Sequence, residues 1–136
     1  MAKLKKKNYT YAIGRRREAS ARVRLYKGTG DNLVNGIIVG KYFPGEISRS
    51  YWTKPFDVLG VEGKYYATAR VLGGGKNGQL DAFVLALSRA FSKLNPEKFR
   101  SILKKEKLLS SDPRIRERRK VGMGGKARRK KQSPKR

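Results

Sequence analysis

Alternating apolar and polar positions predict a series of strands in the first part of the chain. Residues 9–13, 19–26 and 64–72 follow the two-residue period of half-buried strands. In 19–26 the polar face carries arginines. Residues 33–39 place an Asn-Gly pair between two apolar pieces, which predicts a hairpin or a bulge. Between the first two strands, GRRREAS (14–20) is predicted to form a loop.

A 3.6-residue apolar period replaces this alternation further along the chain. It predicts a long helix over 80–95, with Asn77 as its N-cap. Pro96 follows an asparagine, so it ends the long helix and can begin a second one. An Asp-Pro pair repeats this pattern and predicts a short basic helix over 113–120. Another short helix is expected near 47–52.

These elements predict a mixed α+β body, with strands first and helices packed on one face of the sheet. The body spans residues 9–109. A basic arm, residues 1–8, precedes it, and a basic tail, residues 110–136, follows it. After Val121 the tail has too few apolar residues to fold alone. Its last seventeen residues could extend over about 55–60 Å.

The chain is strongly basic. Its 136 residues include 35 Lys and Arg against 10 Asp and Glu, which gives a formal net charge of +25. The tail contributes twelve cations and two anions, so the tail and the rest of the chain are both basic. Self-repulsion at this level favours a polyanionic partner, either a nucleic-acid backbone or an anionic membrane surface.

Cysteine and histidine are absent from the sequence. Their absence excludes disulfides, Cys/His zinc sites, a cysteine nucleophile and a Ser-His-Asp triad. No apolar run approaches the length needed to cross a bilayer, and the first residues lack the apolar core of a secretory signal. We therefore expect a soluble protein of the cytosol, or one made inside an organelle, with no cofactor.

The stretch GGGKNG (73–78) follows a predicted strand and precedes the long helix. Its glycines fit G-x-G-x-x-G, and glycines before a helix let a phosphate approach the backbone. A dinucleotide site also needs a parallel strand after the helix, whereas here a second helix follows. The Walker pattern fails because Gly78 is followed by Gln79. A tight strand-to-helix turn and a loop that approaches RNA phosphates both remain open.

Arg15, Arg16 and Arg17 cluster in the predicted loop, and Arg22 and Arg24 lie on the polar face of the next strand. Arginine forks bind phosphate oxygens in pairs and stack on bases. At this net charge, phosphate binding is favoured over a solvated charged loop. The tail composition indicates a polyanion without saying which one. Strand tyrosines could stack on bases, but strand packing is commoner and we assign them no site.

Three longer stretches occur in a fixed order along the chain. They are GRRREASARV (14–23), GGGKNGQLDAFVLALSRAF (73–91) and DPRIRERRKVGMGGKARRKKQSPKR (112–136). Together they resemble the small-subunit ribosomal protein S-nine family, bacterial type. The resemblance covers essentially the whole chain. It depends on the combination, because no single stretch would suffice.

The resemblance implies a two-layer α+β sandwich of the ribosomal S5 domain-two-like kind, and a non-enzymatic protein of the small-subunit head in the cytoplasm. The implied partners are small-subunit ribosomal RNA, peptidyl-site transfer RNA and neighbouring head proteins, without membrane contact or a homo-oligomer. The residues expected to bind ribosomal RNA are Arg15, Arg16, Arg17, Arg22, Gly73, Gly74, Gly75, Arg114, Arg116, Arg118, Arg119, Lys120, Lys126, Arg128, Arg129, Lys130 and Lys131.

The last residues of the tail depart from the family pattern. The family ends in an aromatic residue followed by Ser-Lys-Arg, whereas this chain ends Gln-Ser-Pro-Lys-Arg. Lys135 and Arg136 carry over from the resemblance as expected transfer RNA contacts. Ser133 is added to them although it is displaced by one position. Pro134 biases Ser133 towards extended geometry.

Three other functions compete with this interpretation. The protein subunit of a ribonucleoprotein enzyme such as ribonuclease P is similarly small and basic, but the long tail and triple glycine fit it poorly. A nonspecific DNA-compacting protein would bind duplex DNA as tightly as folded RNA. A nucleotide-dependent enzyme using GGGKNG would bind NAD or ATP as the free protein.

Overall fold

The computed structural model describes residues 8–115 and 118. These residues form nine elements: four strands come first, then two helices, a fifth strand and two further helices. They are β1 (Tyr9–Arg16), β2 (Ala19–Lys27), β3 (Leu33–Val34), β4 (Ile37–Ile38), α1 (Val39–Tyr42), α2 (Glu46–Leu59), β5 (Tyr65–Leu72), α3 (Lys76–Leu94) and α4 (Pro96–Lys105). Within these residues no helix is long and apolar enough to cross a membrane.

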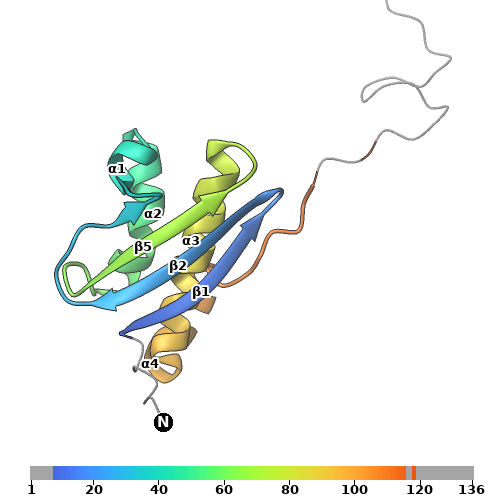
Figure 1. Ribbon diagram of the computed structural model, residues 1–136. Helices are drawn as coiled ribbons and strands as arrows, with labels where there is room; N and C mark the ends of the chain where they lie inside the picture. The colour runs from blue at the N-terminus through green and yellow to red at the C-terminus, as the bar shows by residue number, and fades with distance from the viewer. Residues whose placement is uncertain (1–7, 116–117, 119–136) are drawn as a thin grey trace, which may run out of the picture.

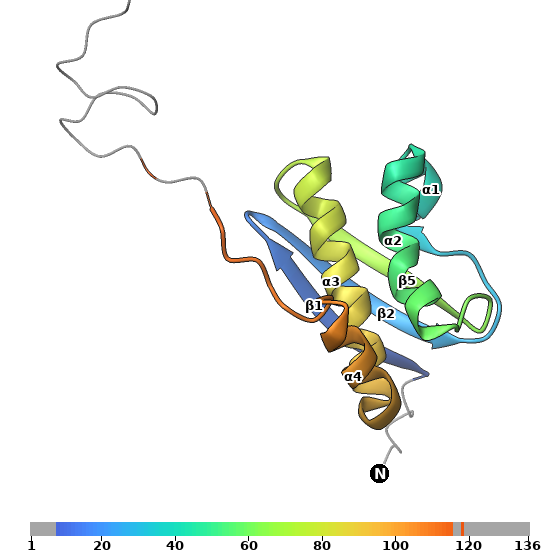
Figure 2. The same ribbon diagram turned by 180° about the vertical axis from the view of Figure 1, so that it is seen from behind.

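The strands form one sheet in the order β1-β2-β5-β3-β4. All neighbouring pairs are antiparallel except β3 and β5, which run parallel. Helices α2, α3 and α4 lie behind the sheet, and none of the described residues covers its other face (Figures 1 and 2). The body is therefore a two-layer α+β structure, which confirms the expected fold class at this level.

Helix α3 forms the centre of the core. It packs across β1 and β2, and its side chains Phe83, Leu87 and Phe91 are fully buried. The closest approach is at Gly14 of β1, where an added Cβ would lie 2.5 Å from the backbone nitrogen of Ala86. Only a residue without a side chain lets the strand and helix backbones come this close.

The predicted strands are confirmed, but the predicted loop over 14–20 is wrong. β1 continues to Arg16 and β2 begins at Ala19, so only Arg17 and Glu18 form the turn. Arg17 adopts a left-handed backbone conformation there, with φ 54°. The two-residue period of β1 continues through Gly14, so Arg15 and Arg16 lie on opposite sides of the strand.

The predicted hairpin over 33–39 is also confirmed. Its Asn-Gly pair connects β3 to β4, with φ of 52° at Asn35 and 80° at Gly36. Positive φ at both turn residues is the geometry for which an Asn-Gly pair is preferred. The Asn35 side chain also ties the turn to β5, because its Oδ1 accepts from the Val71 amide at 2.9 Å.

The helices predicted near 47–52, over 80–95 and from Pro96 are confirmed as α2, α3 and α4 with different extents, whereas α1 was not predicted. The short helix expected near 47–52 is the longer α2, which includes Pro55. Asn77 is wrong as an N-cap, because α3 begins at Lys76 and Gly75 occupies the cap position without a side-chain bond. Asn95 caps α4 instead, since its Oδ1 accepts from the Lys98 amide at 3.3 Å.

The short helix predicted over 113–120 is wrong for 113–115, which are not helical. The Asp112 carboxylate accepts from the Arg114 amide and guanidinium. The carbonyls of Asp112 and Arg114, which a helix would need for its own bonds, accept from the Arg16 guanidinium. Of the rest of the predicted helix only residue 118, also non-helical, is described.

Candidate nucleic-acid interface

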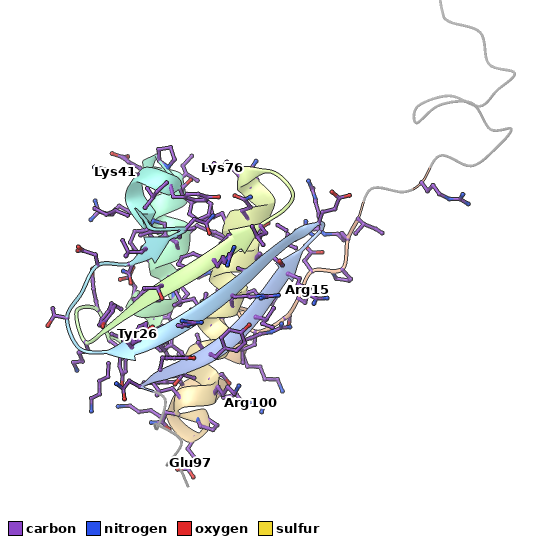
Figure 3. All side chains as sticks on the ribbon, in the orientation of Figure 1. Arg15, Tyr26, Lys41, Lys76, Glu97 and Arg100 are labelled. Atoms are coloured by element: carbon purple, nitrogen blue, oxygen red, sulfur yellow. The ribbon has the colours of Figure 1, made fainter. Side chains whose placement is uncertain are left out.

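The uncovered face of the sheet carries four exposed arginines, which we call the arginine face. Strand register places Arg22 of β2 directly opposite Arg70 of β5, so both side chains project from the same side. Arg24 lies two residues further along β2. Arg15 of β1 lies opposite Ser20 and completes the set near the β1–β2 turn (Figure 3).

No carboxylate occurs in the three described strands that form this face. Like charges directly opposite each other across a sheet destabilise it, so the Arg22–Arg70 pair costs folding free energy. A negative partner from outside the protein would remove that cost. The spacing of cations along adjacent strands suits the regularly spaced phosphates of a nucleic-acid backbone.

Three tyrosines form a rib across one end of the same face. The rings of Tyr26 and Tyr66 stack with centroids 5.1 Å apart, and Tyr9 lies tilted against Tyr26 at 5.7 Å. The Arg24 guanidinium covers Tyr9 at 5.0 Å, and Gly30 lies so close to Tyr66 that a Cβ there would be 2.9 Å from the ring. Because ring faces are occupied at both ends of the rib, its role is strand packing.

The sequence motifs converge at the end of the body where the β1–β2 turn lies. A cavity of about 570 Å³ is lined there by the turn residues Arg17 and Glu18, by residues 74–78 before and in α3, and by Ile115. Three stretches that are far apart in sequence therefore meet around one depression. It adjoins the Arg15 end of the arginine face.

The glycines of GGGKNG have a packing role at this place. Gly73 has φ 76°, and a Cβ on it would lie 2.5 Å from the Glu18 carbonyl oxygen. Gly74 has φ 60° and lies against Ala19 in the same way. This geometry supports the tight strand-to-helix turn. Contact of Gly73, Gly74 and Gly75 with RNA phosphates stays a prediction.

Arg16 is directed into the protein and not towards solvent. It is only 9% exposed. Its Nε lies 3.4 Å from Asp81 Oδ2, and its Nη1 lies 3.0 Å from Asp112 Oδ1. The same Nη1 donates to the Arg114 carbonyl at 3.0 Å. The structure thus gives Arg16 partners within the chain, so we leave it out of the proposed RNA-binding residues.

Asp112 has two arginine partners. The side-chain hydrogen bond from Arg114, the Arg114 backbone amide and the nearby charge of Arg16 hold the pKa of the Asp112 carboxyl well below its usual range. Asp112 therefore contributes stability that is fully present above its ordinary pKa, and this is lost only as the pH falls through the lower value. The carboxylate stays charged across the neutral range.

The other expected RNA-binding residues divide into two groups. Arg15, Arg17, Arg22, Arg114 and Arg118 are exposed. Outside the described residues lie Arg116, Arg119, Lys120, Lys126, Arg128, Arg129, Lys130, Lys131, Ser133, Lys135 and Arg136. The sequence placed Arg24 on the same strand face as Arg22, but it gave no indication of Arg70, although Arg70 also occupies a polar position of a predicted strand.

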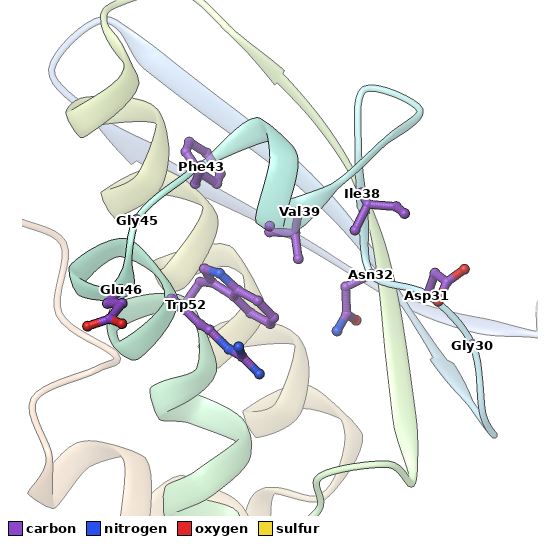
Figure 4. Close-up of a pocket in the computed structure, with 11 residues that line it drawn as sticks. Gly30, Asp31, Asn32, Ile38, Val39, Phe43, Gly45, Glu46 and Trp52 are labelled. Atoms are coloured by element: carbon purple, nitrogen blue, oxygen red, sulfur yellow. The ribbon is translucent and has the colours of Figure 1, made fainter.

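A second depression, of about 520 Å³, lies between the β3–β4 hairpin and α2 (Figure 4). Val39, Phe43 and Trp52 line it together with Asp31 and Glu46. The Trp52 indole N–H is buried and has no hydrogen-bond partner among the described residues. None of the expected site residues that the structure describes lies there, and its mixed charges do not continue the arginine face.

A net-basic α+β body with an acid-free arginine face is typical of small nucleic-acid-binding proteins. Within that class, the chain belongs to the ribosomal protein S9/S16 family, whose sequence profile matches residues 14–136. This confirms the resemblance found in the sequence.

Individual relatives carry ribosomal names. The chain is 44% identical over 112 residues to the small ribosomal subunit protein uS9 of Cutibacterium acnes, a match that covers 82% of this chain and 65% of the relative. It is 45% identical over 112 residues to the protein of the same name from Leifsonia xyli subsp. xyli, covering 82% and 67%. The match thus spans about two thirds of the length of these relatives.

Proposed function

We propose that this protein is a structural, non-enzymatic constituent of the small ribosomal subunit in the cytoplasm, where it binds ribosomal RNA. The observation that carries the proposal is the arginine face, with four exposed guanidinium groups and no carboxylate in its strands. The family supports the identity of the RNA, because its named relatives are small ribosomal subunit proteins.

The body binds RNA phosphates mainly through the arginine face and the adjoining turn. Arg15, Arg22 and Arg24 follow from the sequence, and Arg70 joins them because of the strand register. Arg17 extends the surface at the turn. Each guanidinium can bind a phosphate through two parallel hydrogen bonds, which a lysine cannot do.

We also propose where the protein lies in the small subunit and what its basic tail contacts. The body has the S5 domain-two-like sandwich and lies in the head of the subunit beside neighbouring head proteins. The basic tail runs from Arg114 through ribosomal RNA, and Lys135 and Arg136, with Ser133, contact transfer RNA in the peptidyl site. The charge of the tail supports this, since twelve of its 27 residues are cations.

The competing functions have less support. A dinucleotide enzyme is disfavoured because α4 follows α3 where a parallel strand would be needed. The glycines also pack against the β1–β2 turn. A generic DNA-compacting protein requires only charge, and it leaves the family membership unexplained. A ribonuclease P subunit is likewise disfavoured by that membership.

Sedimentation tests the proposed function directly. Tagged protein in a lysate is expected to migrate with the small ribosomal subunit through a gradient that contains magnesium and high salt. Salt at this level removes loosely bound cationic proteins because each phosphate contact releases counterions. Protein in the top fractions, or spread over nucleic acid of every size, would overturn the proposal in favour of a generic polycation.

Removal of Lys135 and Arg136 tests the role of the tail end. We expect the truncated protein to enter small subunits normally, because the arginine face is intact. Retention of transfer RNA in the peptidyl site should fall by about tenfold, equivalent to roughly 1.4 kcal/mol, for two lost phosphate contacts. Filter binding of transfer RNA to isolated subunits measures the loss. If subunit assembly fails instead, the tail end is primarily an assembly element.

A further inference from the structure

Arg16 joins three distant parts of the chain. It lies at the end of β1, and its guanidinium contacts Asp81 in α3 and Asp112 in the segment that follows α4. It also donates to the carbonyls of Asp112 and Arg114, at 3.3 and 3.0 Å. Figure 2 shows this segment running along the helical layer towards the β1–β2 turn.

We propose that Arg16, Asp81 and Asp112 form a clamp that fixes where, and in which direction, the C-terminal basic segment leaves the body. Arg16 is then a positioning residue: it binds no RNA itself but aligns the segment with the arginine face. This inference rests on the proposed function, since it concerns how the same RNA meets the body and the tail.

The contacts of Arg16 are those expected of a side chain that holds the segment in one fixed position. Arg16 is almost fully buried, so its charge requires partners inside the protein. The planar guanidinium binds one carboxylate with Nε and uses Nη1 for the segment. A lysine in its place could not bind these groups in the same fixed directions. Tyr51 packs beside this site, where burial and the neighbouring Asp81 raise its pKa.

The clamp places the basic segment beside the other cations before any RNA binds. Ile115 lines the cavity that Arg17 and the glycine loop share, and Arg15, near the end of β1 beside the same turn, begins the arginine face. A binding surface arranged in advance loses less conformational freedom on association, which raises affinity. RNA that contacts the body would therefore find the start of the tail in a fixed place.

Neutralising the carboxylates of the clamp distinguishes the clamp from a purely electrostatic effect of charge on RNA binding. Asp112→Asn and Asp81→Asn each remove a negative charge, and so does the control Glu62→Gln at an exposed loop position. Charge alone predicts tighter RNA binding for all three variants. The clamp predicts that the first two bind the specific site more weakly despite their extra positive charge.

The experiment uses full-length proteins competing with tagged wild type for small subunits depleted of this protein. We expect Asp112→Asn to compete about tenfold less well, Asp81→Asn to show a smaller loss, and Glu62→Gln to compete at least as well as wild type. Polyuridylate, a generic single strand, should bind all three variants as tightly as wild type or slightly more tightly. Melting curves identify any variant that fails to fold.

A distance measurement makes the test independent of assembly. The chain has no cysteine, so spin labels at Ser101→Cys on α4 and Ile115→Cys report the position of the segment relative to the body. We expect one narrow distance distribution in the wild-type background and a broad one after Asp112→Asn or Arg16→Lys.

The outcomes distinguish the clamp from the proposed function. Competition by Asp112→Asn and Asp81→Asn equal to that of Glu62→Gln, or a distribution that stays narrow in the clamp variants, would overturn the clamp. If wild type itself does not enter small subunits, the proposed function fails, and the distance distributions still decide whether the clamp fixes the segment.

Discussion

Gly14→Ala is expected to lower the free energy of unfolding by about 3 kcal/mol, the upper part of the usual range for overpacking a core. The added Cβ would collide with the Ala82 carbonyl oxygen and lie 2.5 Å from the Ala86 nitrogen. Both atoms belong to the backbone of α3, so no side chain can rotate away. Thermal unfolding followed by circular dichroism should show a melting temperature lower by about 10 °C or more.

Gly40→Ala is the matched control for this substitution. Gly40 lies in α1, has no atom within 4 Å of an added Cβ, and does not have a positive φ. Alanine should therefore leave stability unchanged or raise it slightly, by about 0.4–1 kcal/mol, because it restricts the unfolded chain. A Gly14→Ala protein that melts within a degree or two of Gly40→Ala would show that α3 and β1 are not packed this tightly.

The two-residue and 3.6-residue periods made most of the fold predictable. The strands of the opening hairpin, β5 and α3 each bury one regular face, so their sequences carry that period directly. α2 could be predicted only in part. It buries little besides Pro55 and Phe56, and a proline inside a helix runs against the sequence rules for helices.

The roles of the three consecutive arginines could not be predicted from composition. Arg15, Arg16 and Arg17 are chemically identical neighbours, yet one lies on the arginine face, one is buried and one is in the turn. The partner of Arg16 in α3 lies 65 positions away in sequence. In residues 9–13 the large apolar side chains occupy the odd positions, so the alternation alone would have placed Arg15, and not Arg16, on the buried face. The even positions are buried because α3 packs closely against Gly14, which the local sequence does not reveal.

The set of interface residues predicted from the sequence was incomplete because part of it depends on contacts between distant parts of the chain. Arg22 was identified because it lies near the arginine cluster, whereas Arg70 stands alone among apolar residues. The two meet only because β5 pairs with β2 across 48 positions of sequence, in the register that places them opposite each other. A surface built by long-range strand pairing needs the topology, and the periodicity of each strand supplies only the face on which each side chain lies.

Arg22→Gln combined with Arg70→Gln should weaken RNA binding while leaving the body as stable or more stable. Affinity for single-stranded RNA at about 0.1 M salt is expected to fall tenfold or more, because two phosphate contacts are lost. The slope of log affinity against log salt should become shallower by about 1.4, at roughly 0.7 for each contact. Fluorescence anisotropy over a series of salt concentrations measures both quantities.

The stability of the same double variant is expected to change in the opposite direction to its affinity for RNA. Two arginines directly opposite each other on one sheet face repel, and relief of such a pair is worth about 0.2–1 kcal/mol. The control is Lys98→Gln combined with Lys104→Gln, two exposed lysines of α4 in the helical layer. It removes the same charge, so a purely nonspecific polycation would lose affinity and slope equally in both double variants. Equal losses would therefore contradict the arginine face as the binding surface. A loss of affinity confined to the arginine pair, with unchanged or higher stability, would support it. These arginines would then be kept because they bind RNA, although their repulsion lowers the stability of the fold.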